Sequence, residues 1–395
     1  MTISYQFMTD HLTTEPIVAE PVTAEPGAAP GPAQLPPGLL ARLPTPCLLV
    51  DLAAADRNIA AAARLLRGTG VRLRPHFKAH KCTELMRRQL RAEGCQGITC
   101  QTAGEAVALA AAGFTDILVA NEVVDQSALD ELGRAAQTAR ITAAADCLEH
   151  VRLLDRAAGA AGTTFDVLVE LDVGAGRCGL PASSPDLVPL AAAIAGAAAL
   201  RLAGLQAYGG HVQHTLGPQL RKTLCYHAEL QVAAELERLA GAGLSCPVVS
   251  GHGTGTLECL APGTIYTEAQ AGSYVLLDAA YQRVTPAFEP ALYCVASVIS
   301  RPEPARAVLD AGLKALAVDD GLPVPAGPGL SVVRLSDEHA QLSVASGADP
   351  AVGDKVFLIP SHVDPTVNLH DALFVYDGEG LARWPVDGRR VTALL

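Results

Sequence analysis

The 395-residue sequence lacks several features that define large protein classes. It has no run of about 18 uncharged apolar residues, so we expect no transmembrane helix. Its first residues are acidic where a secretory signal is basic, and no apolar block follows, so we expect no signal peptide. Lys and Arg number 29 against 41 Asp and Glu, and the formal charge of −12 argues against a nucleic acid or an anionic membrane as partner.

Paired cysteines are also absent. The ten cysteines are scattered and contain no C-x-x-C motif, which favours reduced, mostly buried thiols. Such thiols are typical of a cytoplasmic protein.

What is present indicates two domains behind a tail. Residues 1–40 are dominated by Pro, Ala, Glu and Thr, and proline at this density blocks helices and paired strands, so we predict a disordered tail. Apolar residues make up 50% of the chain, with much alanine that suits closely packed helices. The length is enough for a barrel and a smaller partner domain.

Residues 45–290 alternate strand-like apolar runs with helical stretches such as 55–68 and 225–243. Eight β-then-α units predict an α/β fold, a (β/α)8 barrel of the TIM type. An open, doubly wound parallel sheet is the alternative that this pattern leaves. The predicted strands are 71–77, 97–101, 116–120, 140–145, 165–172, 202–208, 246–251 and 267–274.

From about residue 290 the pattern changes to short apolar runs at close spacing, separated by Gly, Pro and Asp. This pattern predicts a smaller all-β domain over residues 291–395. The early run 45–51 either begins the barrel or pairs with this β domain.

In such a barrel, functional side chains gather at the C-terminal ends of the strands. Lys78 directly follows the first predicted barrel strand, in a chain with few lysines. A lysine held in the barrel mouth is desolvated, which lowers its pKa, and its neutral amine can form an imine. Lys81 is the alternative, although we expect it in the following helix and facing solvent.

The segment SGHGTGT, residues 250–256, places glycines and hydroxyls where the seventh strand ends. Successive backbone N–H groups, aided by Thr254 and Thr256, can hold a phosphate. A phosphate site beside an imine-forming lysine is what pyridoxal 5′-phosphate (PLP) requires.

A third motif, His362-Val363-Asp364, lies in the predicted β domain. On a strand, alternate residues share a face, so the imidazole and the carboxylate would point together as two metal ligands. Mn²⁺, Mg²⁺ or another divalent ion suits this donor pair. An ordinary surface His–Asp pair is the alternative.

Taken together, several segments resemble one family, the D-threonine aldolases and D-3-hydroxyaspartate aldolases, with D-serine dehydratase as a more distant relative. The resemblance runs from about residue 45 to the C-terminus. The segments are RPHFKAHK, ELDVGAGRCGL, GLQAY, GTGT, YTEAQAGSY, LDAGLKA, SDEH and PSHVDPTVNLHD.

The resemblance implies a PLP enzyme of the alanine-racemase-like fold, with residue roles carried over by position. Lys78 would be the catalytic Schiff-base lysine, and His362 and Asp364 would hold a divalent cation, most commonly Mn²⁺, with His362 also counted as catalytic. The residues implied to contact the cofactor are Gln101 at the edge of its ring, Arg177 and Tyr208 along the ring, and Gly253, Thr254 and Gly255 at the phosphate.

The implied reaction is retro-aldol cleavage of a D-3-hydroxy-α-amino acid to glycine and an aldehyde, in a homodimer. Within the group, the dehydratases usually have cysteine where Asp364 stands, and a carboxylate favours Mn²⁺ or Mg²⁺ and hence an aldolase. A dehydratase, a racemase and a PLP-carrier protein remain the alternatives. Racemisation needs no metal, and carriers are generally single-domain barrels.

Two departures from the family pattern lie near the expected pocket. The usual histidine after the sixth-strand tyrosine is Gly209, with His211 two residues later, and His252 stands where glycine is usual. These departures leave the substrate side chain open.

Overall fold

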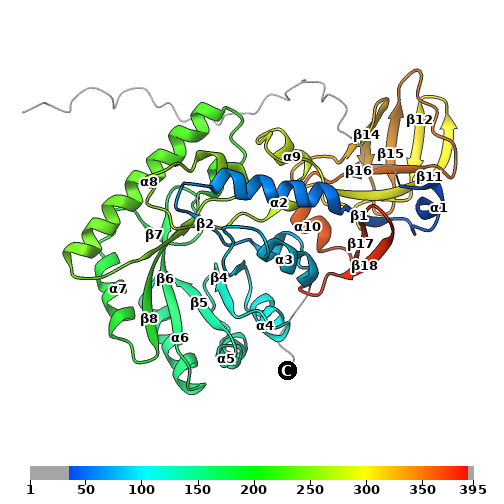
Figure 1. Cartoon of the computed structure of the whole chain (residues 1–395). Helices are drawn as coiled ribbons and strands as arrows, with labels where there is room; N and C mark the ends of the chain where they lie inside the picture. Colours follow the sequence, from blue (N-terminus) through cyan, green and yellow to red (C-terminus); the bar gives the residue numbers. More distant parts are fainter. Residues whose placement is uncertain (1–34, 390–395) are drawn as a thin grey trace, which may run out of the picture.

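The computed structural model describes residues 35–389, which form a barrel joined to a mostly antiparallel β domain (Figure 1). Residues 1–34, the larger part of the predicted tail, lie outside the described residues. At its other end the tail prediction is wrong, because α1 (Pro37–Leu40) is helical. Leu39 and Leu40 pack against buried Cys47 and Leu49, and this burial gives the segment a fixed place.

Eight parallel strands form the barrel, so the predicted α/β barrel class is confirmed. Neighbouring strands pair in order, and isolated bridges Leu73–Cys95 and His76–Thr99 join the two edges of the sheet. The ring is therefore closed, and the open-sheet alternative is wrong. The strands are β2 (Arg72–Leu73), β3 (Ile98–Cys100), β4 (Asp116–Val119), β5 (Arg140–Ala145), β6 (Phe165–Asp172), β8 (Leu200–Ala207), β9 (Val248–Gly251) and β10 (Glu268–Ala269), with the short β7 (Leu180–Pro181) beside β6.

Helices cover the outside of the barrel, as Figure 1 shows. They bury apolar stripes against strands that are themselves almost wholly buried, β6 being an example. Asp51 caps the first long helix by accepting the Ala54 N–H at 3.1 Å. The helices are α2 (Leu52–Leu66), α3 (Thr83–Leu90), α4 (Ala103–Ala111), α5 (Gln126–Ala135), α6 (Leu148–Ala160), α7 (Leu187–Gly196), α8 (Pro218–Gly241) and the short α9 (Ala279–Gln282).

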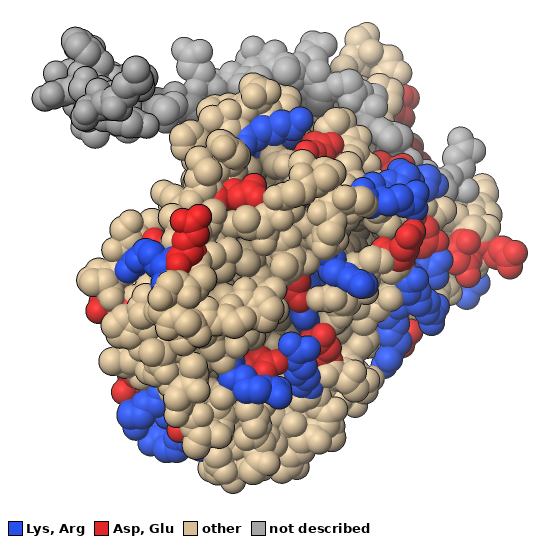
Figure 2. All heavy atoms as spheres, turned by 60° about the vertical axis from the view of Figure 1, so that its left-hand side comes forward, with Lys and Arg blue, Asp and Glu red and all other residues tan. Residues whose placement is uncertain are grey.

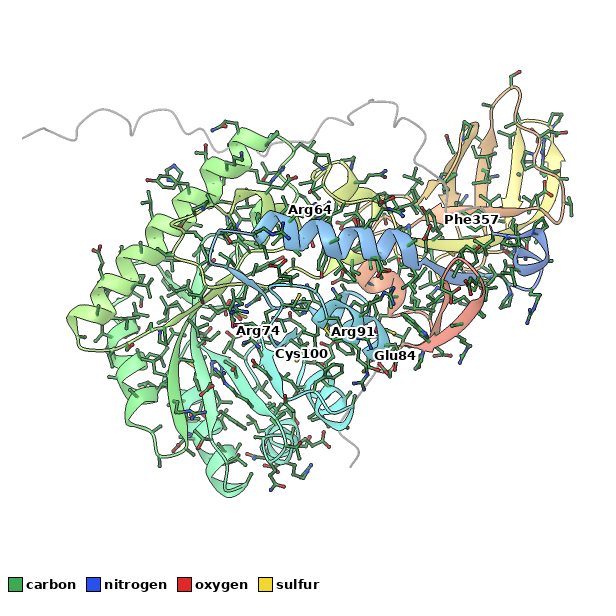
Figure 3. All side chains as sticks on the ribbon, in the orientation of Figure 1. Arg64, Arg74, Glu84, Arg91, Cys100 and Phe357 are labelled. Carbon is green, nitrogen blue, oxygen red and sulfur yellow. The ribbon has the colours of Figure 1, made fainter. Side chains whose placement is uncertain are left out.

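A buried ion network ties the closing strands together. Arg74, just after β2 and labelled in Figure 3, lies 2.7 Å from Glu268 on β10 and 2.8 Å from Asp116 on β4. Gln96 also donates to Glu268 at 2.7 Å. Because removing one partner would leave a buried charge unpaired, the network fixes the strand order at this seam.

The β domain takes its central strand from the start of the chain. β1 (Cys47–Asp51) pairs antiparallel with β11 (Leu292–Glu303) and parallel with β17 (Ala372–Tyr376). Phe357 in Figure 3 marks the same sheet. The remaining strands are β12 (Arg306–Leu309), β13 (Val324–Pro325), β14 (Leu330–Leu335), β15 (Ala340–Val344), β16 (Lys355–Ile359) and β18 (Leu381–Pro385).

One turn of the β domain reaches the barrel mouth. Between β16 and β17 the chain forms α10 (Val363–Val367), which packs against the turn η1 (Phe77–Ala79) that follows β2. The prediction that His362 and Asp364 lie on a strand is therefore wrong: His362 precedes the first turn of α10, and Asp364 lies in that turn. Pro365 follows directly, and a proline suits the first turn of a helix because no N–H partner is needed there.

Charge is mixed on the surface. On the face in Figure 2, Lys and Arg alternate with Asp and Glu and form no broad patch of one sign. Among residues 35–389, no helix is long and apolar enough to cross a membrane.

Candidate active site at the barrel mouth

Lys78 lies in η1, where the chain turns sharply after β2. Its Nζ is 3.7 Å from Oδ1 of Asp364, so the barrel lysine and the β-domain carboxylate face each other. Its backbone N–H points at Nδ1 of His76, 3.4 Å away. Burial, with the nearby charge of Lys78, holds the pKa of His76 well below its usual value, so His76 is neutral and acts as an acceptor here.

Lys81 has a different environment from the one we predicted. It lies before α3, not in it, with a left-handed φ of 48°. Its Nζ is 3.1 Å from Glu105, whose side chain is buried, and the lysine side chain itself is only 19% exposed. Lys81 is thus the counter-charge of Glu105, and this ion pair disfavours its amine as the imine former.

His362 lies between two groups of carboxylates. Its Nε2 faces Asp364 Oδ2 at 3.8 Å, while Nδ1 is 2.6 Å from Asp319 and 3.4 Å from Asp320. Burial opposes the charged imidazole, but the charges of Asp364 and Asp319 raise the pKa of His362 overall. A gap of this size between Nε2 and a carboxylate oxygen suits a bridging cation.

Hydrogen bonds fix this turn against the barrel. Asp278 accepts the Val363 N–H at 3.1 Å, and Ser273 donates to Asp364 Oδ2 at 3.1 Å. On the other side, Thr366 accepts the Ala317 N–H at 3.2 Å, which positions the loop that carries Asp319 and Asp320. The carboxylate pair and His362 therefore come from rigid, mutually bonded segments.

Tyr208, Arg177 and Gln101 surround the same mouth. The Arg177 guanidinium lies 5.8 Å above the Tyr208 ring. Burial raises the pKa of the Tyr208 hydroxyl, which therefore stays protonated at neutral pH. Gln101, just after β3, donates to the Ala120 carbonyl at 3.0 Å.

The glycine-rich loop is held by its own side chains and by Gln213. Thr256 Oγ1 accepts the Gly253 N–H at 2.9 Å, and Gln213 Oε1 accepts the Gly255 N–H at 3.1 Å. Two of the three amides predicted to bind phosphate thus already have acceptors, leaving the Thr254 amide and hydroxyl as the more available donors. The loop then enters η3 (Thr254–Cys259).

Close packing of neighbouring residues requires glycine at two positions of this loop. A Cβ at Gly255 would lie 2.0 Å from the Gln213 carbonyl oxygen, and one at Gly253 would lie 3.1 Å from the Tyr208 ring. The loop is therefore pressed against Tyr208, the residue implied to line the cofactor ring.

The two departures from the family pattern meet at one place. Gly209 and His252 both line a cavity of about 20 Å³, together with Thr256 and Tyr266. The His252 ring stacks edge-on against Tyr266 at 4.5 Å, and its Nδ1 lies 3.2 Å from the Thr256 carbonyl. His252 therefore supports the glycine-rich loop from behind. His211 is exposed and lies over Gly174.

Sequence reasoning missed several groups at this mouth. Asp319 and Asp320 lie more than forty residues before His362, so no local spacing indicates them. His214 is another of these groups. Its ring packs edge-on against Tyr281 with the ring centroids 4.4 Å apart, and although the residue as a whole is exposed, partial burial of the imidazole lowers its pKa, with Asp320 and His362 among the nearby charges. A neutral imidazole in this position can accept a proton.

These residues suit a PLP phosphate ester and a divalent ion. A lysine amine, a tyrosine ring, an arginine and a glycine-supported hydroxyl loop face one mouth, as PLP binding requires. Nε2 of His362 and the carboxylate of Asp364 are a donor pair for Mn²⁺ or Mg²⁺.

Comparison with known proteins gives matches along the chain. The family models "Alanine racemase, N-terminal domain" and "Putative serine dehydratase domain" match residues 50–279 and 291–376. A D-threonine aldolase from an Arthrobacter species is 42% identical, over 92% of this chain and 97% of that protein. A 3-hydroxy-D-aspartate aldolase from Paracoccus denitrificans is 38% identical, over 87% of this chain and 92% of its own. The crystal structure of D-threonine aldolase from Filomicrobium marinum, 40% identical, superposes with a TM-score of 0.84 over 89% of this chain and 97% of that one.

Proposed function

Because this chain belongs to the family of D-threonine aldolases and 3-hydroxy-D-aspartate aldolases, we propose that it is a PLP- and divalent-metal-dependent aldolase. It cleaves D-3-hydroxy-α-amino acids of the D-threonine type to glycine and an aldehyde. The reaction class is a carbon–carbon lyase.

The observation that carries the proposal is the meeting of Lys78 with the turn 362–364. Lys78 Nζ lies 3.7 Å from Asp364, and Asp364 lies 3.8 Å from His362 Nε2. An imine-forming amine and a divalent-ion donor set therefore share one mouth, as a reaction at Cα and the β-oxygen of one substrate needs.

When bound, PLP supplies an aromatic ring that accepts the electron pair of the breaking Cα–Cβ bond, and a divalent ion lowers the pKa of the β-hydroxyl. His362 and Asp364 would hold that ion. An imidazole nitrogen of His214 takes the hydroxyl proton, and the β-carbon becomes the carbonyl carbon of the aldehyde. Lys78 Nζ returns a proton to Cα, which completes glycine. The groups that orient the ring are Tyr208, Arg177 and Gln101, and Thr254 with its neighbouring glycines holds the phosphate.

A dehydratase giving a 2-keto acid and ammonia is the second candidate, favoured by the match of residues 291–376 to a serine dehydratase domain. The carboxylate of Asp364 beside His362 Nε2 supports an oxygen-donor site instead of a softer thiolate site. Mn²⁺ is the ion we propose on this ground.

Three wider properties belong to the proposal. We propose a homodimer, which light scattering after size-exclusion chromatography checks; a stable monomer at micromolar concentration would contradict it. All ten cysteines are free thiols, which supports a cytoplasmic location. The substrate is a small D-3-hydroxy amino acid, and neither nucleic acid nor membrane is a proposed partner.

The test is product analysis with a panel of D-threonine, D-phenylserine and D-3-hydroxyaspartate in the presence of PLP and Mn²⁺. Glycine with acetaldehyde or benzaldehyde supports the D-threonine type, and glycine with glyoxylate as the dominant product assigns the hydroxyaspartate aldolase. A keto acid and ammonia would make the enzyme a dehydratase and contradict the proposal.

A further inference from the structure

Two cysteines with no part in the proposed reaction face each other behind the glycine-rich loop. Cys225 lies on α8 and is 9% exposed, and Cys259 is the last residue of η3. The two thiols lie close enough for each to change the pKa of the other. Since α8 and η3 pack together, this contact joins the barrel wall to the helix that continues the loop.

A buried cation lies beside Cys259 without a complete set of acceptors. Arg221 is 2% exposed, and its nearest carboxylate, Glu258, is 3.5 Å away. Carbonyls of Thr215 and Val284 accept from its two terminal nitrogens. Its Nε, however, has no acceptor among the described residues. A thiolate on Cys259 would supply a further acceptor and a second negative charge beside Arg221.

The surroundings also favour that thiolate. Contact with Cys225 lowers the pKa of Cys259, and the charges of Arg221 and Lys222 lower it further, against the effect of burial. The same contact and burial raise the pKa of Cys225, which therefore keeps its proton. The two thiols therefore suit different roles, Cys259 as the nucleophile and Cys225 as its protonated partner.

The two thiols line different cavities. Cys259 lines a cleft of about 430 Å³ together with Arg221, Lys222 and Glu258. Cys225 instead lines the cavity of about 20 Å³ that it shares with His252 and Thr256. The much larger cleft therefore gives a small oxidant more room at Cys259.

We propose that Cys225 and Cys259 are a redox-reactive dithiol, with Cys259 the nucleophile toward hydrogen peroxide and Cys225 the resolving thiol. The Cys259 thiolate attacks one peroxide oxygen, the O–O bond breaks, and hydroxide takes up a proton to leave as water while Cys259 becomes a sulfenic acid. The Cys225 sulfur then forms the S–S bond, and the sulfenic oxygen leaves with the Cys225 proton and its own proton as another water. Two thiols are oxidised and one peroxide is reduced to two waters.

The bridge would act on the glycine-rich loop. Thr256, in the middle of η3, accepts from Gly253 and contacts His252, so a movement of Cys259 toward α8 is passed to residues 252–254. Oxidation should therefore weaken the hold on a phosphate, a consequence that depends on the proposed PLP function, whereas the dithiol itself does not.

The test treats the purified full-length enzyme with hydrogen peroxide and maps the peptides without reduction. We expect one cross-linked fragment that joins Cys225 to Cys259 and that dithiothreitol separates. Because Cys246 is near Cys259 in the sequence, fragmentation of the peptide must show which of the two carries the bridge. If the peroxide is consumed completely and this bridge does not form, the proposal is overturned.

Single variants separate the two roles. Dimedone, which labels sulfenic acids, should label Cys259 in the variant Cys225→Ser. In Cys259→Ser, Cys225 should stay unlabelled. The control Cys147→Ser, at an exposed cysteine, should still form the bridge. Faster labelling of Cys225 than of Cys259 would contradict the assigned roles. PLP titration of the oxidised apoprotein should give a Kd several-fold above that of the reduced protein, and an equal Kd would contradict the coupling to the loop.

Discussion

Lys78 and Lys81 are three residues apart, but their surroundings assign them different tasks. Lys78 faces Asp364 across the barrel mouth, whereas Lys81 neutralises Glu105, a carboxylate in the barrel wall. We expect Lys78→Ala to lose the covalent PLP adduct that borohydride forms with the wild type.

Lys81→Ala should keep that adduct and lose about 2 kcal/mol of unfolding free energy, because Glu105 remains buried without its cation. Mass spectrometry of the reduced adduct and urea unfolding measure the two effects. An adduct that persists in Lys78→Ala and disappears in Lys81→Ala would reverse the assignment.

Asp319 orients His362 through Nδ1, at 2.6 Å, and leaves Nε2 toward Asp364. A carboxylate in this position fixes the ring and makes it a better ligand, so Asp319→Ala should raise the metal Kd about 10- to 100-fold. PLP affinity should be unchanged.

Calorimetric titration with Mn²⁺ measures the change, and Asp349→Ala, at an exposed residue elsewhere in the β domain, is the control. A wild-type metal Kd in Asp319→Ala would show that the aspartate does not position the ligand.

At the scale of elements, the regular strands were predicted well and the turns were not. Runs such as β5 and β6 were predicted with the bounds that they have, because buried parallel strands are continuous apolar segments. The predicted strands 71–77 and 267–274 were both too long, since β2 ends at Leu73, where the chain turns into η1, and β10 ends at Ala269. The metal turn was predicted as a strand because a two-residue spacing does not distinguish a strand from the start of a helix.

The same limit applies to the glycine-rich loop. Its glycines were predicted as phosphate donors, and the structure adds a packing reason that depends on Gln213, more than forty residues earlier. Sequence spacing carries no information on such a contact.

η3 is the element on which the loop depends, and Gly255→Ala tests it. The added Cβ would lie 2.0 Å from the Gln213 backbone, so the loop must shift, and the Kd for PLP should rise at least about tenfold, or about 1.4 kcal/mol. Gly241→Ala should keep the wild-type Kd, because a Cβ added there, at the end of α8, would have no neighbour outside its own helix within 4 Å. Absorbance titration of both apoproteins measures it, and equal affinities would contradict the tight packing.

For the whole molecule, buried histidines make folding sensitive to acid. Burial lowers the pKa of His80 and of His252 from 6.5 to about 4. Because the folded pKa lies below the unfolded one, their stability contribution is complete above pH 6.5 and is lost as the pH falls toward 4. At pH 5 the loss is about 2 kcal/mol for each histidine.

The variant His252→Gly isolates the contribution of His252 to the loss of stability in acid. Glycine suits the left-handed φ of 56° at this position, and the variant should lose about 2 kcal/mol less than the wild type between pH 7 and pH 5. Urea unfolding at the two pH values gives the difference. Parallel losses in both proteins would show that His252 is not buried in its neutral form.

The barrel and the β domain contribute one half of the site each, and β1 links them by placing the N-terminal strand at the centre of the C-terminal sheet. The most direct test of this shared site measures glycine and acetaldehyde from D-threonine with PLP-loaded wild type, the EDTA-treated enzyme, the same enzyme after Mn²⁺ is restored, and Asp364→Ala. We predict product from the first and third samples only, with PLP still bound in all four. Cleavage that continues in EDTA and in Asp364→Ala would contradict a metal-dependent aldolase built where Lys78 meets the turn 362–364.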